Sequence, residues 1–332
     1  MFSRFIIACV TLAVASPLSF AQQPIIINFS HVTAKDTPKG MAAEFFKKAA
    51  EERTKGRVQV NVYPNSQLYK DKEEVEALQL GAVQMLAPSL SKFGPMGLRE
   101  FEVFELPYLF SSYDDVHKVT RGATGDLLLK KLEPKGIVGL AYWDNGFRQM
   151  TANRATRTPA DFKGLKLRIV SAKVTDAYTR ALGAMPQMLS FSEVYQAMQT
   201  GVVDGGENSL SNIYTQKFYE VQKFLSMTNH GYLGYAVIAN KKFWDGLPSD
   251  IRTILEGAMR DATKHNDEIA QKENEDALEA IRKSGKTQIV ALTAQEKAVL
   301  KKTLLPVHQQ MEDRIGKNIV QAVYKDIGFK SE

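Results

Sequence analysis

The sequence is poor in cysteine and carries no large excess of charge of either sign. Cys9 is the only cysteine in 332 residues, so a scaffold held by disulfides is excluded. Lys and Arg number 43 against 37 Asp and Glu, and no polybasic run stands out. This mild excess suits an anionic partner, although a merely solvated basic surface explains it equally well. With 44% hydrophobic residues the chain is not a disordered one, and its length allows two domains.

Long apolar runs are missing as well, except at the start of the chain. Arg4 precedes an eleven-residue apolar run, Phe5–Ala15, and Pro17 ends it. A membrane span needs about 20 apolar residues, so this run is too short. Small residues at Ser19 and Ala21 complete the pattern of a secretory signal peptide. We predict that residues 1–21 are removed on export and that the remaining chain is soluble and free of thiols.

The next 120 residues alternate between strand and helix patterns. Residues 25–29 read as a buried strand, and Thr37-Pro38 opens a helix that ends near Gly56. A period-two strand follows over 58–62, then a helix over 71–80 and an apolar strand over 83–87. Strands that alternate with helices predict an α/β fold.

The pattern restarts after Pro134, which indicates a second α/β unit. Strands are predicted at 137–143, 147–151 and 165–170, with a short helix from Thr158 between the last two. Ser190 and Glu193 have the spacing of a capping box before a helix that runs to Thr200, and a further strand is expected to begin at Val202.

The segment 249–284 has an uninterrupted helical pattern. It contains no proline and a single glycine, Gly257. A helix of 36 residues is about 54 Å long, which exceeds the ~30 Å of one small domain. We therefore predict a helix that runs along two lobes and has a solvated middle over 266–276; a surface helix kinked at Gly257 is the alternative. A strand over 288–292 and a helix capped by Thr293, interrupted at Pro306, complete the chain.

Motifs for catalysis and for metal binding are missing. The five histidines are scattered without His-x-x-x-His spacing, and there is neither a nucleophile elbow nor a Walker or Rossmann glycine pattern. We therefore predict no metal, no cofactor and no enzymatic activity.

Two arginines occupy positions where a ligand could be bound. Arg148 follows a glycine-marked turn after an apolar strand, and Arg168 alternates with Leu167 and Ile169 inside another strand. A guanidinium among apolar residues is unfavourable unless it meets a carboxylate or phosphate, which it can bind in bidentate fashion. An internal salt bridge or an exposed edge strand is the alternative explanation.

At these residues the sequence resembles a known family, the extracytoplasmic solute-binding subunits of TRAP transporters. The resemblance rests on residues 146–170 and 190–208, on F-E-L-P-Y-L-F at 104–110 and on the opening segment 29–40. The opening, together with L-A-P-S-L at 86–90, is most similar to the C4-dicarboxylate branch.

The resemblance implies a hinged two-lobe periplasmic receptor in which a long helix spans both lobes. Lobe I would comprise residues 22–145 and about 231–273, and lobe II residues 146–230 and about 274–332. The ligand would be a small dicarboxylate of the succinate, malate and fumarate class. The receptor, a monomer, would deliver it to a small and a large membrane subunit. Another organic acid, a sensor for a kinase and, less favoured, an exported enzyme remain alternatives.

The resemblance also implies the roles of particular residues. Arg168 would bind the ligand carboxylate, Arg148 would be a second cation near it, and Asn208 would donate a hydrogen bond. Phe191 would form an apolar wall. The distal end of the ligand would be reached by three further residues: Lys35, Ser89 and Tyr232.

The sequence departs from the family pattern at two places, and these departures bear on the binding loop and on the ligand class. The usual G-Q-E-N-P appears here as Gly205-Gly206-Glu207-Asn208-Ser209, so the backbone that enters this loop can differ. Where sialic-acid receptors of the family carry a glutamate, this chain offers Pro88 or Ser89. The missing acid argues against a sugar acid of that kind and is compatible with a second anionic group on the ligand.

Overall fold

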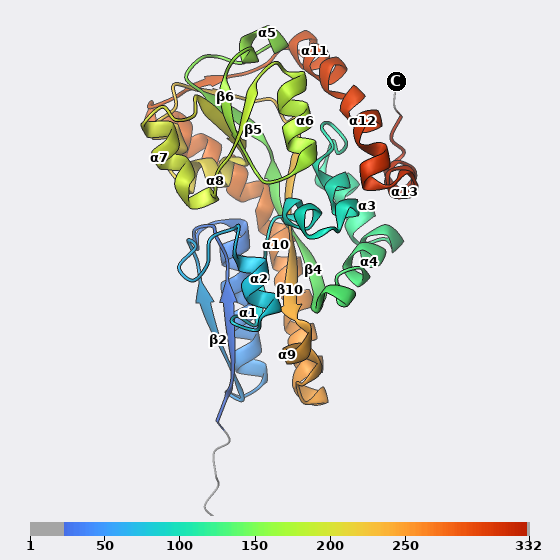
Figure 1. The fold of residues 1–332 in the computed structure, drawn as a ribbon. Coiled ribbons are helices and arrows are strands. Elements are labelled where there is room, and N and C mark those ends of the chain that lie inside the picture. Colours follow the sequence, from blue (N-terminus) through green and yellow to red (C-terminus); the bar gives the residue numbers. More distant parts are fainter. Residues whose placement is uncertain (1–22, 331–332) are drawn as a thin grey trace, which may run out of the picture.

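The computed structural model describes residues 23–330, and the predicted signal peptide lies outside them. The chain folds into two α/β units, each built on its own sheet, which confirms the predicted fold class (Figure 1). Within the described residues, none of the helices combines the length and the apolar character that crossing a membrane demands.

The first sheet has the strand order β2-β1-β3-β10-β4. Its strands are β1 (Ile25–Ser30), β2 (Val58–Tyr63), β3 (Met85–Leu86), β10 (Tyr232–Asn240) and β4 (Ile137–Phe147). The parallel strands β1, β2 and β3 are linked through α1 (Pro38–Arg53) and α2 (Glu74–Gln79), whereas β10 pairs antiparallel with β3 and β4.

The second sheet has the order β11-β9-β5-β8-β6-β7. Its strands are β5 (Gln149–Ala152), β6 (Lys166–Ile169), β7 (Met185–Met188), β8 (Gly205–Asn208), β9 (Phe224–Ser226) and β11 (Gln288–Val290). Helices α5 (Pro159–Phe162), α6 (Lys173–Ala181), α7 (Val194–Gln199) and α8 (Leu210–Thr215) connect them.

The remaining helices lie beside the two sheets. They are α3 (Tyr113–Thr120), α4 (Ala123–Lys130), α9 (Lys241–Asp245), α11 (Ala294–Leu304), α12 (Pro306–Ile315) and α13 (Lys317–Ile327), together with the 3-10 helices η1 (Leu90–Lys92), η2 (Gly94–Met96), η3 (Arg99–Glu105), η4 (Glu133–Lys135), η5 (Phe191–Glu193) and η6 (Phe218–Glu220). Helix α11 packs against α5 and α6, whereas α12 and α13 reach η3 and α3 of the first unit.

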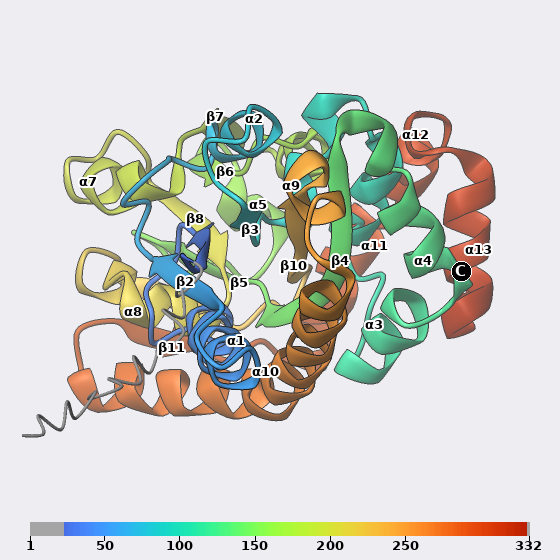
Figure 2. The same ribbon diagram turned by 90° about the horizontal axis from the view of Figure 1, so that it is seen from below.

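The chain crosses between the two sheets at three places. Strand β4 of the first sheet leads through Arg148 into β5 of the second, and β9 leads back through residues 227–231 into β10. The third crossing is α10 (Ser249–Ser284), whose bounds are those predicted from the sequence. It packs against α1 and β4 and then against α8, and Figure 2 shows it bending between them.

The polar middle of α10 is not simply solvated, as the sequence had suggested. Asn266 and Asn274 are buried and hold the end of β4. The amide of Asn266 accepts a hydrogen bond from the backbone N–H of Asp144 (2.6 Å) and donates one to its carbonyl (3.1 Å), while Asn274 donates to the carbonyl of Asn145 (2.7 Å). The long helix is therefore tied to the strand that crosses between the lobes.

Local signals in the sequence placed most of the element ends. Thr37 caps α1 through the N–H of Gly40, and capping boxes are present at Thr158, Ser190 and Thr293. The box at Ser190 opens a 3-10 turn rather than α7 directly. The strand expected from Val202 begins only at Gly205, because residues 201–204 form a turn that leaves Val202 exposed.

Candidate functional site

A small cavity, about 40 Å³ in volume, lies where the two lobes meet. The first lobe and the crossing segment at Arg148 contribute Val32, Thr33, Asp71, Glu74, Ser89, Lys92, Arg148, Leu233 and Tyr235, and the second contributes Arg168, Val170, Phe191, Asn208 and Asn212. The lobes also touch beside the cavity, because Asp71 accepts a hydrogen bond from the N–H of Phe191 (3.3 Å). The two lobes are therefore in direct contact at the cavity.

Arg168, the predicted carboxylate-binding residue, lines the cavity, and its side chain is 2% exposed. Nε and Nη2 both donate to the carbonyl of Leu189 (3.1 and 2.9 Å), and Asp71 lies 4.0 Å from Nη2. Within residues 23–330, Nη1 makes no hydrogen bond. Burial lowers the pKa of Arg168 to about 10, and Asp71 only partly opposes this effect. Arg168 is thus a buried cation with donors to spare.

Arg148 also lines the cavity, but its donors are engaged by the protein itself. Nη2 donates to Glu105 (2.9 Å), Nη1 to Glu207 (3.1 Å) and Nε to the carbonyl of Tyr232 (3.1 Å). Burial lowers the pKa of Arg148, but the two carboxylates outweigh it and leave the pKa raised. The internal salt bridge considered from the sequence is therefore the arrangement found at Arg148.

The acids around Arg148 link both crossing strands. Glu207 of β8 also accepts hydrogen bonds from His230, which lies between β9 and β10, and from Tyr178. Burial raises the pKa of Glu207, but Arg148 and His230 lower it to about 2. Burial raises the pKa of Glu105 to about 7 despite Arg148. This network of buried charges joins the two segments that cross between the sheets, Arg148 and residues 227–231.

Three further residues of the predicted site, Asn208, Phe191 and Ser89, also lie at the cavity. The amide oxygen of Asn208 accepts from Asn212 (2.8 Å), whereas its Nδ2 has no partner within residues 23–330. The Phe191 ring lies 5.9 Å from the Arg168 guanidinium carbon and forms an apolar wall. Asn208 therefore has a donor beside Arg168.

Lys35 and Tyr232, which were expected to reach the distal end of the ligand, do not line this cavity. Lys35 lies exposed in the loop before α1. Tyr232 packs on Phe110 and Phe147 and donates to Asp144 (2.5 Å). Alternation along β10 sends Leu233 and Tyr235 to the cavity and Tyr232 to the opposite face.

A group of charged residues on the first lobe, not predicted from the sequence, is buried next to the cavity. Lys92 pairs with Asp71 at 2.7 Å, and both are buried. Lys39 is fully buried; its Nζ donates to the carbonyl of Ala87 (3.0 Å) and lies 3.8 Å from the centroid of the Tyr235 ring. Burial lowers the pKa of Lys39 to about 8, against the opposing effect of Glu74 and Asp71. No sequence signal separated these residues from ordinary surface charges.

One group of side chains in the described part of the chain lies close enough to hold a metal ion: His117, Asp144 and Asp267. The group is already satisfied internally. His117 contacts Asp144 at 2.6 Å, and Arg121 pairs with Asp267 at 2.5 Å. A cation there would have to displace both contacts.

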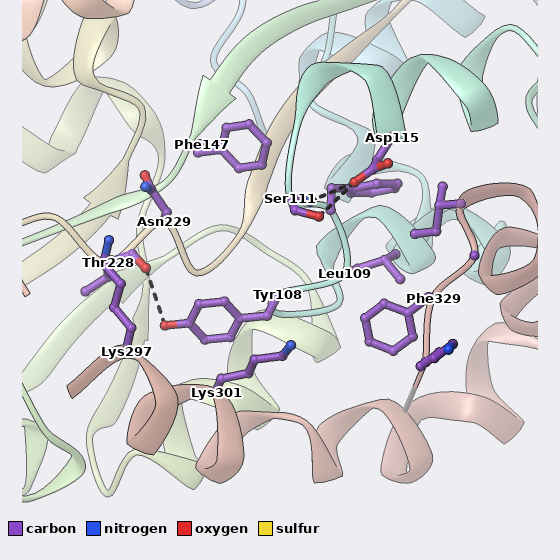
Figure 3. Close-up of a pocket in the computed structure, with 14 residues that line it drawn as sticks. Tyr108, Leu109, Ser111, Asp115, Phe147, Thr228, Asn229, Lys297, Lys301 and Phe329 are labelled. Carbon is purple, nitrogen blue, oxygen red and sulfur yellow. Dashed lines mark hydrogen bonds between the residues drawn. The ribbon is translucent and has the colours of Figure 1, made fainter. Parts of the chain in front are cut away.

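A larger hollow of about 430 Å³ lies beside the hinge (Figure 3). Tyr108, Phe147 and Asn229 line one side and the lysines of α11, Lys297 and Lys301, the other (Figure 3). These lysines lie on a helix at the open surface, whereas the small cavity gathers buried cations from both lobes. A buried guanidinium without a carboxylate partner, such as that of Arg168, indicates an anion-binding site. We therefore assign the candidate site to the small cavity.

Two α/β lobes joined by crossing strands, with a cation-rich cavity between them, define a solute-binding receptor. Comparison with known proteins agrees. Residues 29–314 match the family model described as bacterial extracellular solute-binding protein, family 7, and the chain belongs to this family.

Relatives and solved structures extend the likeness over nearly the whole chain. The C4-dicarboxylate-binding periplasmic protein DctP of Rhodobacter capsulatus is 58% identical over 96% of both chains. The C4-dicarboxylate-binding protein DctB of Bacillus subtilis is 42% identical over 90% of this chain and 86% of its own. A TRAP periplasmic solute-binding protein from Shewanella oneidensis, solved with bound succinate, has a TM-score of 0.89 at 41% identity and covers 92% of this chain and 99% of its own. One from Pseudomonas aeruginosa, solved with bound L-malate, has a TM-score of 0.84 at 41% identity, over 86% of this chain and 100% of its own.

Proposed function

We propose that this protein is the extracytoplasmic receptor of a TRAP transporter and that it binds a C4-dicarboxylate between its lobes. The observation that carries the proposal is Arg168: a guanidinium 2% exposed, with unused donors, at a cavity shared by both lobes. The names of the relatives and the ligands of the solved structures support the dicarboxylate class.

In the proposed complex one carboxylate lies against Arg168 and Asn208. Each charge-assisted hydrogen bond contributes about 1.5–3 kcal/mol, so a few of them reach the ~8 kcal/mol of a micromolar receptor after ordering costs. Arg148 attracts the ligand through its positive charge and does not donate a hydrogen bond to it, because its own donors are taken by Glu105 and Glu207. The ligand bridges both lobes and shifts their open–closed equilibrium toward closure.

The division into lobes proposed from the sequence, 22–145 with about 231–273 and 146–230 with about 274–332, is supported by the membership of the two sheets. Closure would rotate these lobes about Arg148 and residues 227–231, with α10 bending between them. Helix α13 also packs on α3 of the first lobe. During closure this contact either breaks or α13 moves together with the first lobe.

We further propose that the receptor is exported by cleavage after Ala21, works in the periplasm as a monomer and hands its ligand to the small and large membrane subunits. It performs no chemistry on that ligand. A sensor for a kinase would share the same site; the two roles separate in a transport assay with the membrane subunits in liposomes, where only a transport receptor supports uptake of labelled ligand.

The ligand class is tested by a thermal-shift screen of residues 22–332 against organic acids. Succinate, L-malate and fumarate are expected to raise the melting temperature most. Solved structures similar to this chain hold galactonate at 32% identity and orotic acid at 28%, so both acids belong in the screen. A larger shift with either of them than with every C4-dicarboxylate would contradict the proposal.

A further inference from the structure

Glu74, the first residue of α2, lines the cavity with an unsatisfied carboxyl group. Its side chain is almost wholly buried, at 1% exposure, and neither carboxyl oxygen has a hydrogen-bond partner within residues 23–330. Buried polar groups in folded proteins are nearly always hydrogen-bonded, so an unpaired carboxyl that faces a cavity points to a partner supplied from outside.

Charged groups surround Glu74 without contacting it. Lys39 of α1 donates to the carbonyl of Ala87 instead, and Lys92 of η1 is paired with Asp71, which precedes α2. Tyr235 of β10 lies beneath Lys39. No cation of the described chain comes within 4.0 Å of Glu74. Burial raises the pKa of Glu74 to about 7, and Asp71 adds to this effect, while Lys39 and Lys92 only partly oppose it.

The charge balance of the cavity depends on whether Glu74 carries a proton. Asp71 is paired with Lys92, and Glu105 and Glu207 with Arg148, which leaves Arg168 as the cation at the cavity that has no carboxylate within hydrogen-bond distance. With Glu74 ionised, Arg168 and Glu74 sum to zero charge; with Glu74 protonated, they sum to one positive charge, which favours an anionic ligand. A protonated carboxyl also becomes a donor, whereas an ionised one would repel a ligand carboxylate.

We infer that Glu74 binds the distal carboxylate of the ligand as a protonated hydrogen-bond donor, so that the receptor takes up a proton when it binds a dicarboxylate dianion. The proton comes from solvent and is bound at a Glu74 carboxyl oxygen; no covalent bond to the ligand forms. This inference rests on the proposed function, because it requires a ligand with two carboxylates. It assigns to Glu74 the distal contact for which Lys35 and Tyr232 lie in the wrong places.

The direction of the pH effect follows from this assignment. A ligand that accepts a hydrogen bond from protonated Glu74 raises the pKa of Glu74 further. Affinity is then full below about pH 7 and falls as the pH rises above it, approaching tenfold per pH unit for one proton. Lys39 is fully buried and does not line the cavity; burial lowers its pKa to about 8 and Glu74 opposes this, so the titration of Lys39 depends on that of Glu74.

The test is calorimetric titration of succinate into residues 22–332 at pH 8, in two buffers that differ in ionisation enthalpy, which counts the protons taken up. Glu74→Gln keeps the shape and a donor but cannot ionise. The wild type is expected to take up close to one proton more than Glu74→Gln, and the variant to bind succinate at least as tightly at pH 8 with a flatter pH profile. Glu73→Gln, one residue earlier and exposed, is the matched control and should behave like the wild type.

Equal proton uptake in the wild type and Glu74→Gln would overturn the inference, as would a folded Glu74→Gln that no longer binds succinate. A wild type that binds succinate with no proton uptake would overturn it without any variant. If the wild type bound no dicarboxylate at any pH from 5 to 9, the proposed function itself would fail, so the two failures are distinguishable.

Discussion

Replacement of Arg168 by methionine separates ligand binding from folding. Nη1 of Arg168 has two N–H groups without a partner in the described chain, and Nη2 keeps one after donating to Leu189. A carboxylate can accept two of these. At about 1.5–3 kcal/mol each, their loss removes about 3–6 kcal/mol, which corresponds to about 10²–10⁴-fold weaker binding.

The expected signal in a melting experiment follows from mass action. For a receptor with a Kd of about 1 µM, 1 mM succinate stabilises the fold by about 4 kcal/mol. A chain of this length shifts by roughly 1.5 °C per kcal/mol, so the wild type should gain about 6 °C. After a weakening of 10²-fold or more, Arg168→Met should gain about 2 °C or less.

The unliganded variant provides the internal control. Since burial lowers the pKa of Arg168 and Asp71 keeps its pairing with Lys92, loss of this cation should leave the melting temperature without ligand unchanged or higher. Arg180→Met, on the exposed face of α6, is the matched arginine control and should keep the full succinate shift. A full shift in Arg168→Met, with unchanged calorimetric affinity, would refute the assignment.

Three further predictions concern folding and stability. Arg148→Met leaves two buried glutamates unpaired, so the unfolding free energy without ligand should fall by about 3–5 kcal/mol, measured by denaturant titration; an unchanged value would contradict the internal role of Arg148. Gly205→Ala places a Cβ 2.1 Å from a backbone carbonyl of β5 and should destabilise the protein by about 1–3 kcal/mol or more. Gly257→Ala, on the surface of α10, should instead stabilise the protein by up to about 1 kcal/mol. The same denaturant titration compares the two variants, and equal effects would argue against the tight β5–β8 pairing. The hydrogen bond to Asp144 raises the pKa of His117 in the folded protein. The contribution of protonated His117 to the unfolding free energy is therefore complete below the unfolded pKa of about 6.5 and is lost as the pH rises through the folded pKa. His117→Gln should flatten this part of the pH profile of stability, and an unchanged profile would contradict the contact.

Much of the fold could be predicted because its signals are local. Thr37 and Thr293 cap the helices that the sequence assigned to them, and the continuous pattern over 249–284 gave the long helix with its observed bounds. The middle of that helix is solvated on one face, whereas its other face is buried for a tertiary reason. Asn266 and Asn274 have the sequence pattern of surface residues. Their amides are buried because β4 packs against α10 and its backbone at Asp144 and Asn145 hydrogen-bonds to them.

The site could be predicted only in part for the same reason. Arg168 stood out because its strand is otherwise apolar, and the structure places it at the cavity. Lys39 and Glu74 each lie in the first turn of a helix, where charged residues are usually exposed, so nothing local marks them as buried. Lys39 contacts the carbonyl of Ala87 and the ring of Tyr235, and α2 packs on β10, so their burial involves residues far away in the chain.

The most direct test of the account is a crystal structure of residues 22–332 grown with succinate. We predict one carboxylate of the ligand within hydrogen-bond distance, 2.7–3.2 Å, of Nη1 of Arg168 and of Nδ2 of Asn208, with the other carboxylate beside Glu74. Succinate found instead in the lysine-lined hollow of Figure 3, with Arg168 still donating only to Leu189, would contradict the central claim.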